Sequence, residues 1–256
     1  CTGEALNLAA EHGHFEVVKW LYDIRTDTCS GGCSAMSKAV ENGHLSIAQW
    51  FHSVKREVCS ADAIIKAAKN GHLEVLEWLH LNNLFKCTKA AIEGAAESGH
   101  LEVVKWLHQV QHERGSAQIL RGAVNSGNLE LVEWVYENVH LKCHRNDHPY
   151  LDTTTVARRG HLDLLKWLHE HFPDSISGCD DLLDAAAANG HMDVIEWLHK
   201  QGQTGYSESA PCSAARNGDL PLLKWLHAKS SRGIVNRPFV MDWAASKGYL
   251  EIVRWL

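Results

Sequence analysis

A twelve-residue pattern that recurs along the chain constrains its fold more than any other feature. It reads KNGHLEVLEWLH at residues 69–80 and ESGHLEVVKWLH at residues 97–108. Its glycine recurs at intervals of 28 to 33 residues, and a tryptophan stands seven residues after each glycine, so that only Trp243 among the 10 tryptophans falls outside the frame. Self-similarity of this period is typical of solenoids built from stacked units. The repeat glycines are Gly13, Gly43, Gly71, Gly99, Gly127, Gly160, Gly190, Gly218 and Gly248.

Each unit is predicted to be a pair of short helices joined by a turn at the glycine. Before the glycine, a pair of small residues such as Ala95 and Ala96 follows a large apolar residue, Ile92, at the spacing of one helix face. After the glycine, apolar residues two, four, five, seven and eight positions on cover an arc of about 220° on a helix. One helix pair cannot bury so wide an arc alone, so the units must stack.

The spacing therefore predicts one all-α array of nine helix-turn-helix units over residues 1–256. We expect the chain to be a fragment of a longer protein, because the last helix stops at Leu256 and neither terminal unit has the polar outer face of a capping repeat. The units are placed near residues 2–28, 29–58, 59–86, 87–114, 115–146, 147–176, 177–206, 207–235 and 236–256.

The pattern resembles the ankyrin repeat over essentially the whole chain. The likeness is carried by A-A-x-x-G at the end of the first helix and H-L-E-V-V-K-x-L in the second, as at residues 95–107, and it looks most like the variant with W-L-H that is common in oomycete proteins. The family's T-P-L-H start is absent, and the common interval of 28 is about five residues short of the usual 33. The resemblance implies an ankyrin-like solenoid with short or missing β-hairpin fingers that presents mainly its first helices.

Composition narrows the partners and the compartment. Lysine and arginine number 25 against 31 acidic residues, a formal charge of −6, so we expect neither nucleic acid nor a membrane as partner. No run approaches the roughly 18 apolar residues of a membrane span, and no signal-peptide pattern is present. The 8 cysteines are spread over the chain, which favours reduced thiols and an intracellular, cytoplasmic location.

Neither catalysis nor a bound metal or cofactor is predicted. The motifs G-x-S-x-G, H-E-x-x-H and C-x-x-C are missing, and no phosphate-binding glycine loop follows a strand pattern. Twelve of the 18 histidines stand one or nine residues after a repeat glycine. Those one residue after it are expected to cap the second helix, and those nine residues after it to bond its last carbonyls or a neighbouring loop. In the segment HLKCHRNDH, the spacing of His140, Cys143, His144 and His148 allows a zinc site but fits no recognised pattern, so a polar insertion loop is favoured. Cys29 and Cys33 are likewise not favoured as metal ligands.

What remains is recognition by residues that break the repeat. Positions six, five and two before each glycine vary between units and are expected to point outward from the first helix. Trp243 is the sharpest single candidate, because an exposed tryptophan is a common interface anchor. The candidate partner-binding residues are Ile65, Lys66, Lys69, Arg121, Thr154, Arg158, Arg216 and Trp243.

The sequence thus predicts a non-enzymatic scaffold that binds a protein partner through variable residues of its first helices and loops. Two alternatives stay open: a structural spacer within a large assembly, and a targeting module of a longer multidomain protein. Two local features also carry expectations. The β-branched run at residues 153–156 disfavours a helix, and Pro211 is expected to delay the start of its helix.

Overall fold

The computed structural model describes residues 3–24, 32–56, 58–85, 88–111, 116–139, 151–177, 181–203, 205–229 and 238–256. Within these ranges every regular element is a helix and no strand of a hairpin finger occurs, which confirms the predicted fold class. The chain divides into two compact units, residues 1–143 and 144–256. The division lies in the longest interval between repeat glycines, from Gly127 to Gly160.

Helix pairs make up both units. The described part of the first unit contains α1 (Gly3–Glu11) and α2 (Phe15–Ile24), α3 (Gly32–Glu41) and α4 (Leu45–Lys55), α5 (Ala61–Lys69) and α6 (Leu73–Leu81), α7 (Lys89–Glu97) and α8 (Leu101–Gln111), and α9 (Ala117–Ser126) and α10 (Leu129–Asn138). That of the second contains α11 (Thr153–Arg159) and α12 (Leu162–His171) with the one-turn α13 (Asp174–Ser177), α14 (Leu182–Ala188) and α15 (Met192–Lys200), α16 (Ser209–Asn217) and α17 (Leu220–Lys229), and α18 (Pro238–Ser246) and α19 (Leu250–Trp255).

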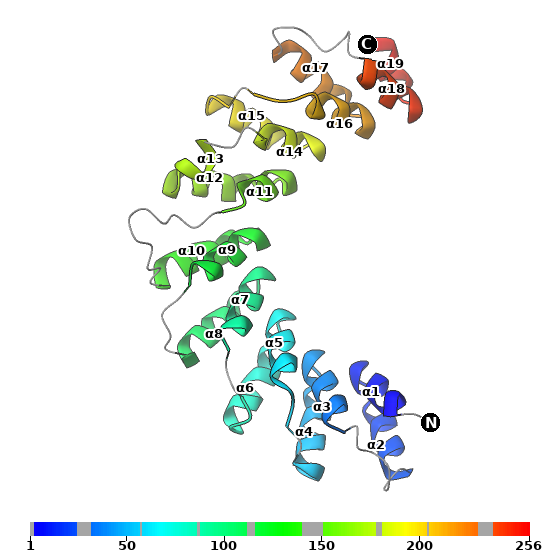
Figure 1. Ribbon diagram of the computed structural model, residues 1–256, viewed down its shortest axis with the longest axis vertical. Coiled ribbons are helices and arrows are strands. Elements are labelled where there is room, and N and C mark those ends of the chain that lie inside the picture. The colour runs from blue at the N-terminus through cyan, green and yellow to red at the C-terminus, as the bar shows by residue number, and fades with distance from the viewer. Residues whose placement is uncertain are drawn as a thin grey trace. The chain divides into compact units, whose positions relative to one another are not determined.

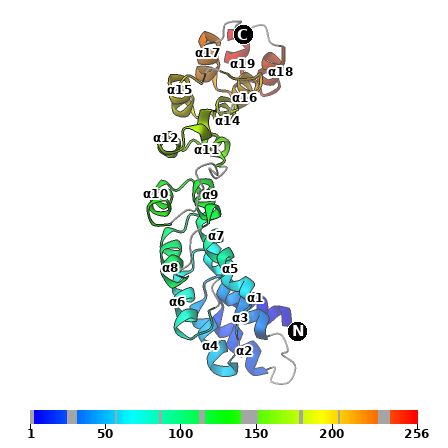
Figure 2. The same ribbon diagram turned by 60° about the vertical axis from the view of Figure 1, so that its left-hand side comes forward.

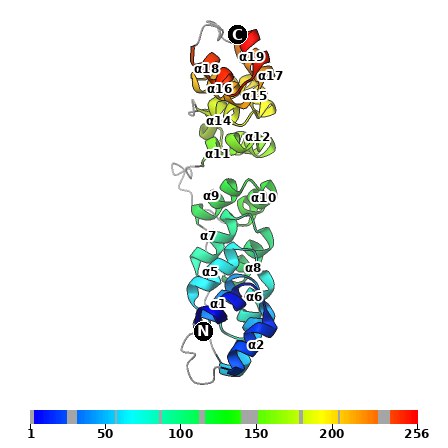
Figure 3. The same cartoon turned by 90° about the vertical axis from the view of Figure 1, so that its right-hand side faces the viewer.

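Within each unit the first helices of the pairs form one layer and the second helices form another (Figure 1). Successive first helices pack directly on one another, as α5 does on α7 and α7 on α9. The same two layers are visible when the molecule is turned by 60° and by 90° (Figures 2 and 3). The small residues of the repeat lie between the helices, where Ala67, Ala68, Ala95 and Ala96 are fully buried. Small side chains therefore let neighbouring first helices approach closely.

The turn within each pair needs glycine for two reasons. All nine repeat glycines have a positive φ, between 74° and 82°, which other residues rarely adopt. In five repeats the space above the glycine is also filled by a ring of the next repeat; a Cβ on Gly43, for example, would lie 2.5 Å from Nδ1 of His72. The glycine thus sets both the turn and the contact between neighbouring repeats.

Histidines directly after the glycine join repeats instead of capping helices. His44, His72, His161 and His191 stand at N-cap positions, but none makes a side-chain cap hydrogen bond. Nε2 of His44 instead lies 2.9 Å from the carbonyl oxygen of Glu11, in the preceding repeat. The prediction that these histidines cap the second helix is therefore wrong, because the ring is turned toward the preceding first helix.

Shorter polar side chains supply the caps and further bonds between repeats. Asn128 caps α10, its side chain accepting a hydrogen bond from the Leu131 amide at 3.2 Å. Just before the glycine, asparagine side chains donate to a carbonyl at the end of the preceding first helix, which has no partner within its own helix. These bonds run from Asn70 to Glu41 at 2.9 Å, from Asn189 to Arg158 at 2.7 Å and from Asn217 to Ala188 at 2.8 Å.

Histidines nine residues after the glycine contact the tryptophan of the next repeat. The His80 and Trp106 ring centroids are 5.8 Å apart at 89°, and those of His108 and Trp134 are 5.6 Å apart at 85°. Such edge-to-face pairs are a favoured aromatic geometry. The expected bonds to helix carbonyls are absent for His80 and His108, which use their rings to connect second helices. Equivalent pairs are Tyr22–Trp50, His52–Trp78, His169–Trp197, His199–Trp225 and His227–Trp255.

Two features expected to disturb helices do not. Residues 153–159 form α11, because Asp152 accepts from the Thr155 amide at 2.9 Å and the buried Thr153 hydroxyl donates to the Ser175 carbonyl at 3.1 Å. Pro211 is the third residue of α16, in the first turn, where an amide has no partner within the helix. Both expectations are therefore wrong.

Candidate partner-binding surface

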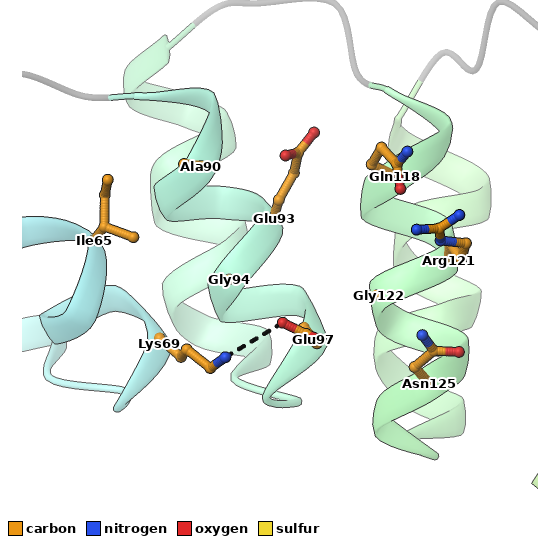
Figure 4. A pocket seen from close by; sticks show the side chains of 10 residues that line it. All are labelled: Ile65, Lys69, Ala90, Glu93, Gly94, Glu97, Gln118, Arg121, Gly122 and Asn125. Atoms are coloured by element: carbon orange, nitrogen blue, oxygen red, sulfur yellow. Dashed lines mark hydrogen bonds and ion pairs between the residues drawn. The ribbon is translucent and has the colours of Figure 1, made fainter. Parts of the chain in front are cut away.

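The variable positions of the first helices form one face, which we call the first-helix face. It comprises the residues nine, six, five and two before each repeat glycine, written below as positions −9, −6, −5 and −2. Figure 4 shows how these positions on α5, α7 and α9 come together around one hollow. The arrangement follows from helical spacing, since steps of three and four residues share a side of the helix.

The hollow of the first unit has a volume of about 350 Å³ and mixed charge. Lys69 and Arg121 bring positive charge to its lining, and Glu93 and Glu97 bring negative charge. The Lys69 ammonium pairs with Glu97 at 3.4 Å (Figure 4). Its floor is low because two glycines, one on α7 and one on α9, lie at position −5. The other lining residues are Ile65, Ala90, Gly94, Gln118, Gly122 and Asn125.

A second hollow, of about 430 Å³, lies on the first-helix face of the second unit. Arg158 of α11 and Arg216 of α16 both line it, with α14 between them. Its lining is mostly polar or small, and its remaining residues are Thr154, Asp181, Asp184, Ala185, Ala188, Ser207, Ser209 and Ser213.

The predicted residues fall into two groups. Ile65, Lys69 and Arg121 line the first hollow, and Thr154, Arg158 and Arg216 line the second. Lys66 and Trp243 line neither of these two hollows. Trp243 lies on α18 with 42% of its surface exposed.

Lys66 is held by its own carboxylate neighbours. Its ammonium lies 3.1 Å from Asp62 and 3.2 Å from Glu41. These partners raise its pKa, the hydrogen bond with Asp62 contributing most. An exposed ion pair of this kind is weak enough to be exchanged for a partner's carboxylate.

Sequence reasoning missed position −9. Ala90 and Gln118 line the first hollow from this position, and Asp181 and Ser209 line the second. The sequence could have indicated this position, because position −9 lies one helical turn before positions −5 and −6 and so shares their side of the helix. In the last repeat this position holds Phe239, which is 63% exposed.

Position −6 has a structural role in several repeats that the sequence did not reveal. The Ser37 hydroxyl accepts from the Ser60 amide at 3.0 Å, and Glu93 accepts from the Ser116 hydroxyl at 2.9 Å. Asp184 accepts from the amides of Ser207 at 3.0 and 3.1 Å and Ala210 at 3.1 Å. In these repeats the side chain at position −6 reaches the start of the following first helix, so it already has hydrogen-bond partners within the chain.

Three other pKa shifts lie away from this face. Burial lowers the pKa of His72, with further lowering by the nearby His44 and His100. Burial likewise lowers the pKa of His161, helped by Arg159 and His191. Burial raises the pKa of the Cys59 thiol to about 11, which leaves the thiol protonated and unreactive at neutral pH.

The described residues contain no group of three or more histidine, cysteine, aspartate or glutamate side chains placed to hold a metal ion. The considered group of His140, Cys143, His144 and His148 lies outside the described residues, as does Cys29; the side chain of Cys33 is likewise not described. None of the described helices combines the length and the apolar character needed to cross a membrane.

The fold and its repeated turn define the class of protein as a helix-pair solenoid. Residues 5–52 and 154–199 match the family described as ankyrin repeats (many copies), so these two segments carry the ankyrin repeats that the sequence pattern predicted. Among solved structures, the crystal structure of the human ASB11 ankyrin repeat domain is similar at a TM-score of 0.52 and 19% identity, covering 75% of this chain and 96% of that one. At that identity the likeness shows the fold alone. No curated protein matches the chain in sequence.

Proposed function

We propose that the chain is a non-enzymatic scaffold that binds a protein partner through the first-helix face and the adjoining loops. Ankyrin repeats generally mediate protein–protein interaction, and this family is typically non-enzymatic. One observation supports the proposal for this chain. The glycine and the tryptophan recur in all nine repeats and the alanine pair in six of them, whereas the residues lining the two hollows differ from repeat to repeat. Packing fixes the first set and leaves the second available for recognition.

The proposal also covers the chemical class of the partner, the cellular compartment and the division of the chain into units. The mildly acidic balance of −6 favours a protein over nucleic acid or an anionic membrane surface. The dispersed cysteines favour an intracellular, cytoplasmic location, where thiols stay reduced. The division into nine units of one array, at the boundaries given above, also remains a proposal.

Affinity capture from an extract of the producing cells tests the proposal. The test variant combines Arg121→Ala, Arg158→Ala and Trp243→Ala, which removes two cations and one exposed aromatic side chain from the first-helix face. The matched control combines Lys224→Ala, Arg254→Ala and Trp20→Ala, which removes the same kinds of groups from exposed sites on second helices. Circular dichroism and thermal unfolding check that both variants fold.

We expect proteins captured by the wild-type chain to be lost from the first-helix variant and kept by the control. Identical partner sets for all three folded chains would overturn the role of this face. A wild-type chain that captures nothing would favour the structural spacer instead.

A further inference from the structure

Two arginines on the first-helix face of the second unit differ from the lysines of that face in the first unit. On the first unit, Lys38 pairs with Glu11 at 3.4 Å, and Lys69 pairs with Glu97 at 3.4 Å. Arg158 and Arg216 form no ion pair with any residue in the described ranges, and both are exposed. Their charges are therefore not neutralised within the described fold.

The two arginines form opposite walls of one hollow. Both stand at position −2, and the repeat between them has Ala188 at that position. The floor is also low, because Ala185 and Ser213 occupy position −5. Arg158 and Arg216 thus line the hollow of about 430 Å³ from its two outer helices, and α14 contributes Asp184 and two alanines between them.

The described acidic residues near the hollow do not form ion pairs with Arg158 or Arg216. Asp184 also lines the hollow, but its carboxylate accepts hydrogen bonds from the Ser207 and Ala210 amides at the start of α16. Asp242 stands at position −6 of α18, next to Trp243, and is exposed. Asp181 is the remaining acidic lining residue, and it is exposed. Two guanidinium groups therefore share the hollow with two carboxylates, Asp181 and Asp184, neither of which forms an ion pair with them in the described part of the chain.

The next repeat continues this face with aromatic side chains. Trp243 and Phe239 stand at positions −5 and −9 of α18, one helical turn apart, with 42% and 63% of their surfaces exposed. The corresponding positions of α16 hold Ser213 and Ser209. An apolar end therefore adjoins the wall formed by Arg216.

We propose that this surface binds an acidic segment of a partner protein, an inference that rests on the proposed function and names the chemistry of the partner. Aspartate or glutamate side chains of the segment pair with Arg158 and Arg216, and a large apolar residue packs on Trp243 and Phe239. Guanidinium groups suit this role because they bind carboxylates through two parallel hydrogen bonds. Aromatic residues such as tryptophan are also frequent anchors of protein interfaces.

The repeat spacing sets the spacing of the acidic residues. Neighbouring helix axes are about 8–10 Å apart, so α11 and α16 are separated by roughly 16–20 Å. An extended segment advances about 3.3 Å per residue. Two carboxylates about five or six residues apart therefore match the two arginines.

Selection from a phage-displayed library of random sixteen-residue peptides on the immobilised chain tests the proposal. Selected peptides are synthesised, and their dissociation constants are measured by fluorescence anisotropy at low and high salt. The variants are Arg158→Ala, Arg216→Ala and Trp243→Ala. The control is Arg254→Ala, which removes an exposed arginine from the second helix α19.

We expect the selected peptides to carry at least two acidic residues and one large apolar residue. Each arginine variant should weaken binding about tenfold, which corresponds to about 1.4 kcal/mol. The control should not weaken it, and binding of the wild-type chain should fall as salt rises. Selected peptides without acidic enrichment, or acidic peptides insensitive to both arginine variants, would overturn this inference.

The proposed function fails separately from this inference. Peptides that lose affinity on first-helix substitutions other than the two arginines would keep the first-helix face as the binding surface and remove only the acidic partner. If no peptide is enriched, or none responds to any first-helix substitution, both proposals fall.

Discussion

At the scale of single residues, two glycines inside first helices play different roles. Gly94 and Gly122 both stand at position −5 and line the first hollow. A Cβ on Gly94 would be in ordinary contact with Lys69 Cβ, at 3.6 Å. A Cβ on Gly122 would lie 3.0 Å from the backbone nitrogen of Glu97, which is too close for a fixed backbone atom. The absence of a side chain at Gly122 therefore allows α9 to pack closely on α7, whereas at Gly94 it only widens the first hollow.

We expect Gly94→Ala to stabilise the protein and Gly122→Ala to destabilise it. Alanine is favoured over glycine in a helix by about 1 kcal/mol. At Gly122 this gain is outweighed by overpacking, which costs about 1–3 kcal/mol. Urea unfolding followed by circular dichroism measures both. Equal stabilisation of the two variants would show that α7 and α9 are not in close contact at this point.

At the scale of elements, acceptors at position −6 fix the start of the next first helix. Asp184 is the strongest case, because an ionised side chain accepts bonds from two backbone amides at the N-terminal end of α16. The positive end of the helix dipole adds to these bonds. The side chain thus acts as a cap supplied by the preceding repeat.

Asp184→Ala should destabilise the second unit by about 1–2 kcal/mol, the range found for loss of a helix cap. Glu196→Ala serves as the control, because Glu196 is an exposed residue of α15, and its loss should change stability by less than about 0.5 kcal/mol. Thermal unfolding compares both with the wild-type chain. A loss no larger than that of the control would mean that the Asp184 bonds contribute nothing net.

The helix pairs could be predicted from sequence because glycine, alanine and tryptophan report packing within a repeat. Contacts between repeats could not, because they depend on how successive pairs are offset. For this reason, the His44 ring was predicted as a cap although it contacts the preceding repeat, and the bonds of Asp184 were not foreseen. The same limit applies to the surface. Arg158 and Arg216 were singled out one by one, but the hollow that they share became visible only in three dimensions.

At the scale of the whole molecule, two histidines that follow repeat glycines, His72 and His161, make stability depend on pH. Burial is the largest cause of the lowered pKa of both His72 and His161. The neighbouring His44 and His100 lower the pKa of His72 further. Arg159 and His191 lower the pKa of His161 further. A lowered pKa means that the unfolded chain binds protons more readily than the folded one. Their stabilising effect is therefore complete above the unfolded pKa of about 6.5 and is lost as pH falls through the lower folded pKa.

The thermal unfolding midpoint should therefore be lower at pH 5 than at pH 7. His72→Asn and His161→Asn together test the cause, because the chain itself carries asparagine at the equivalent position, where Asn128 caps α10. The double variant should keep its fold and lose part of the pH dependence, since two of the shifted groups no longer titrate. A midpoint that is equal at both pH values in the wild-type chain would contradict the lowered pKa of these histidines. An unchanged pH dependence in the double variant would assign it to other groups.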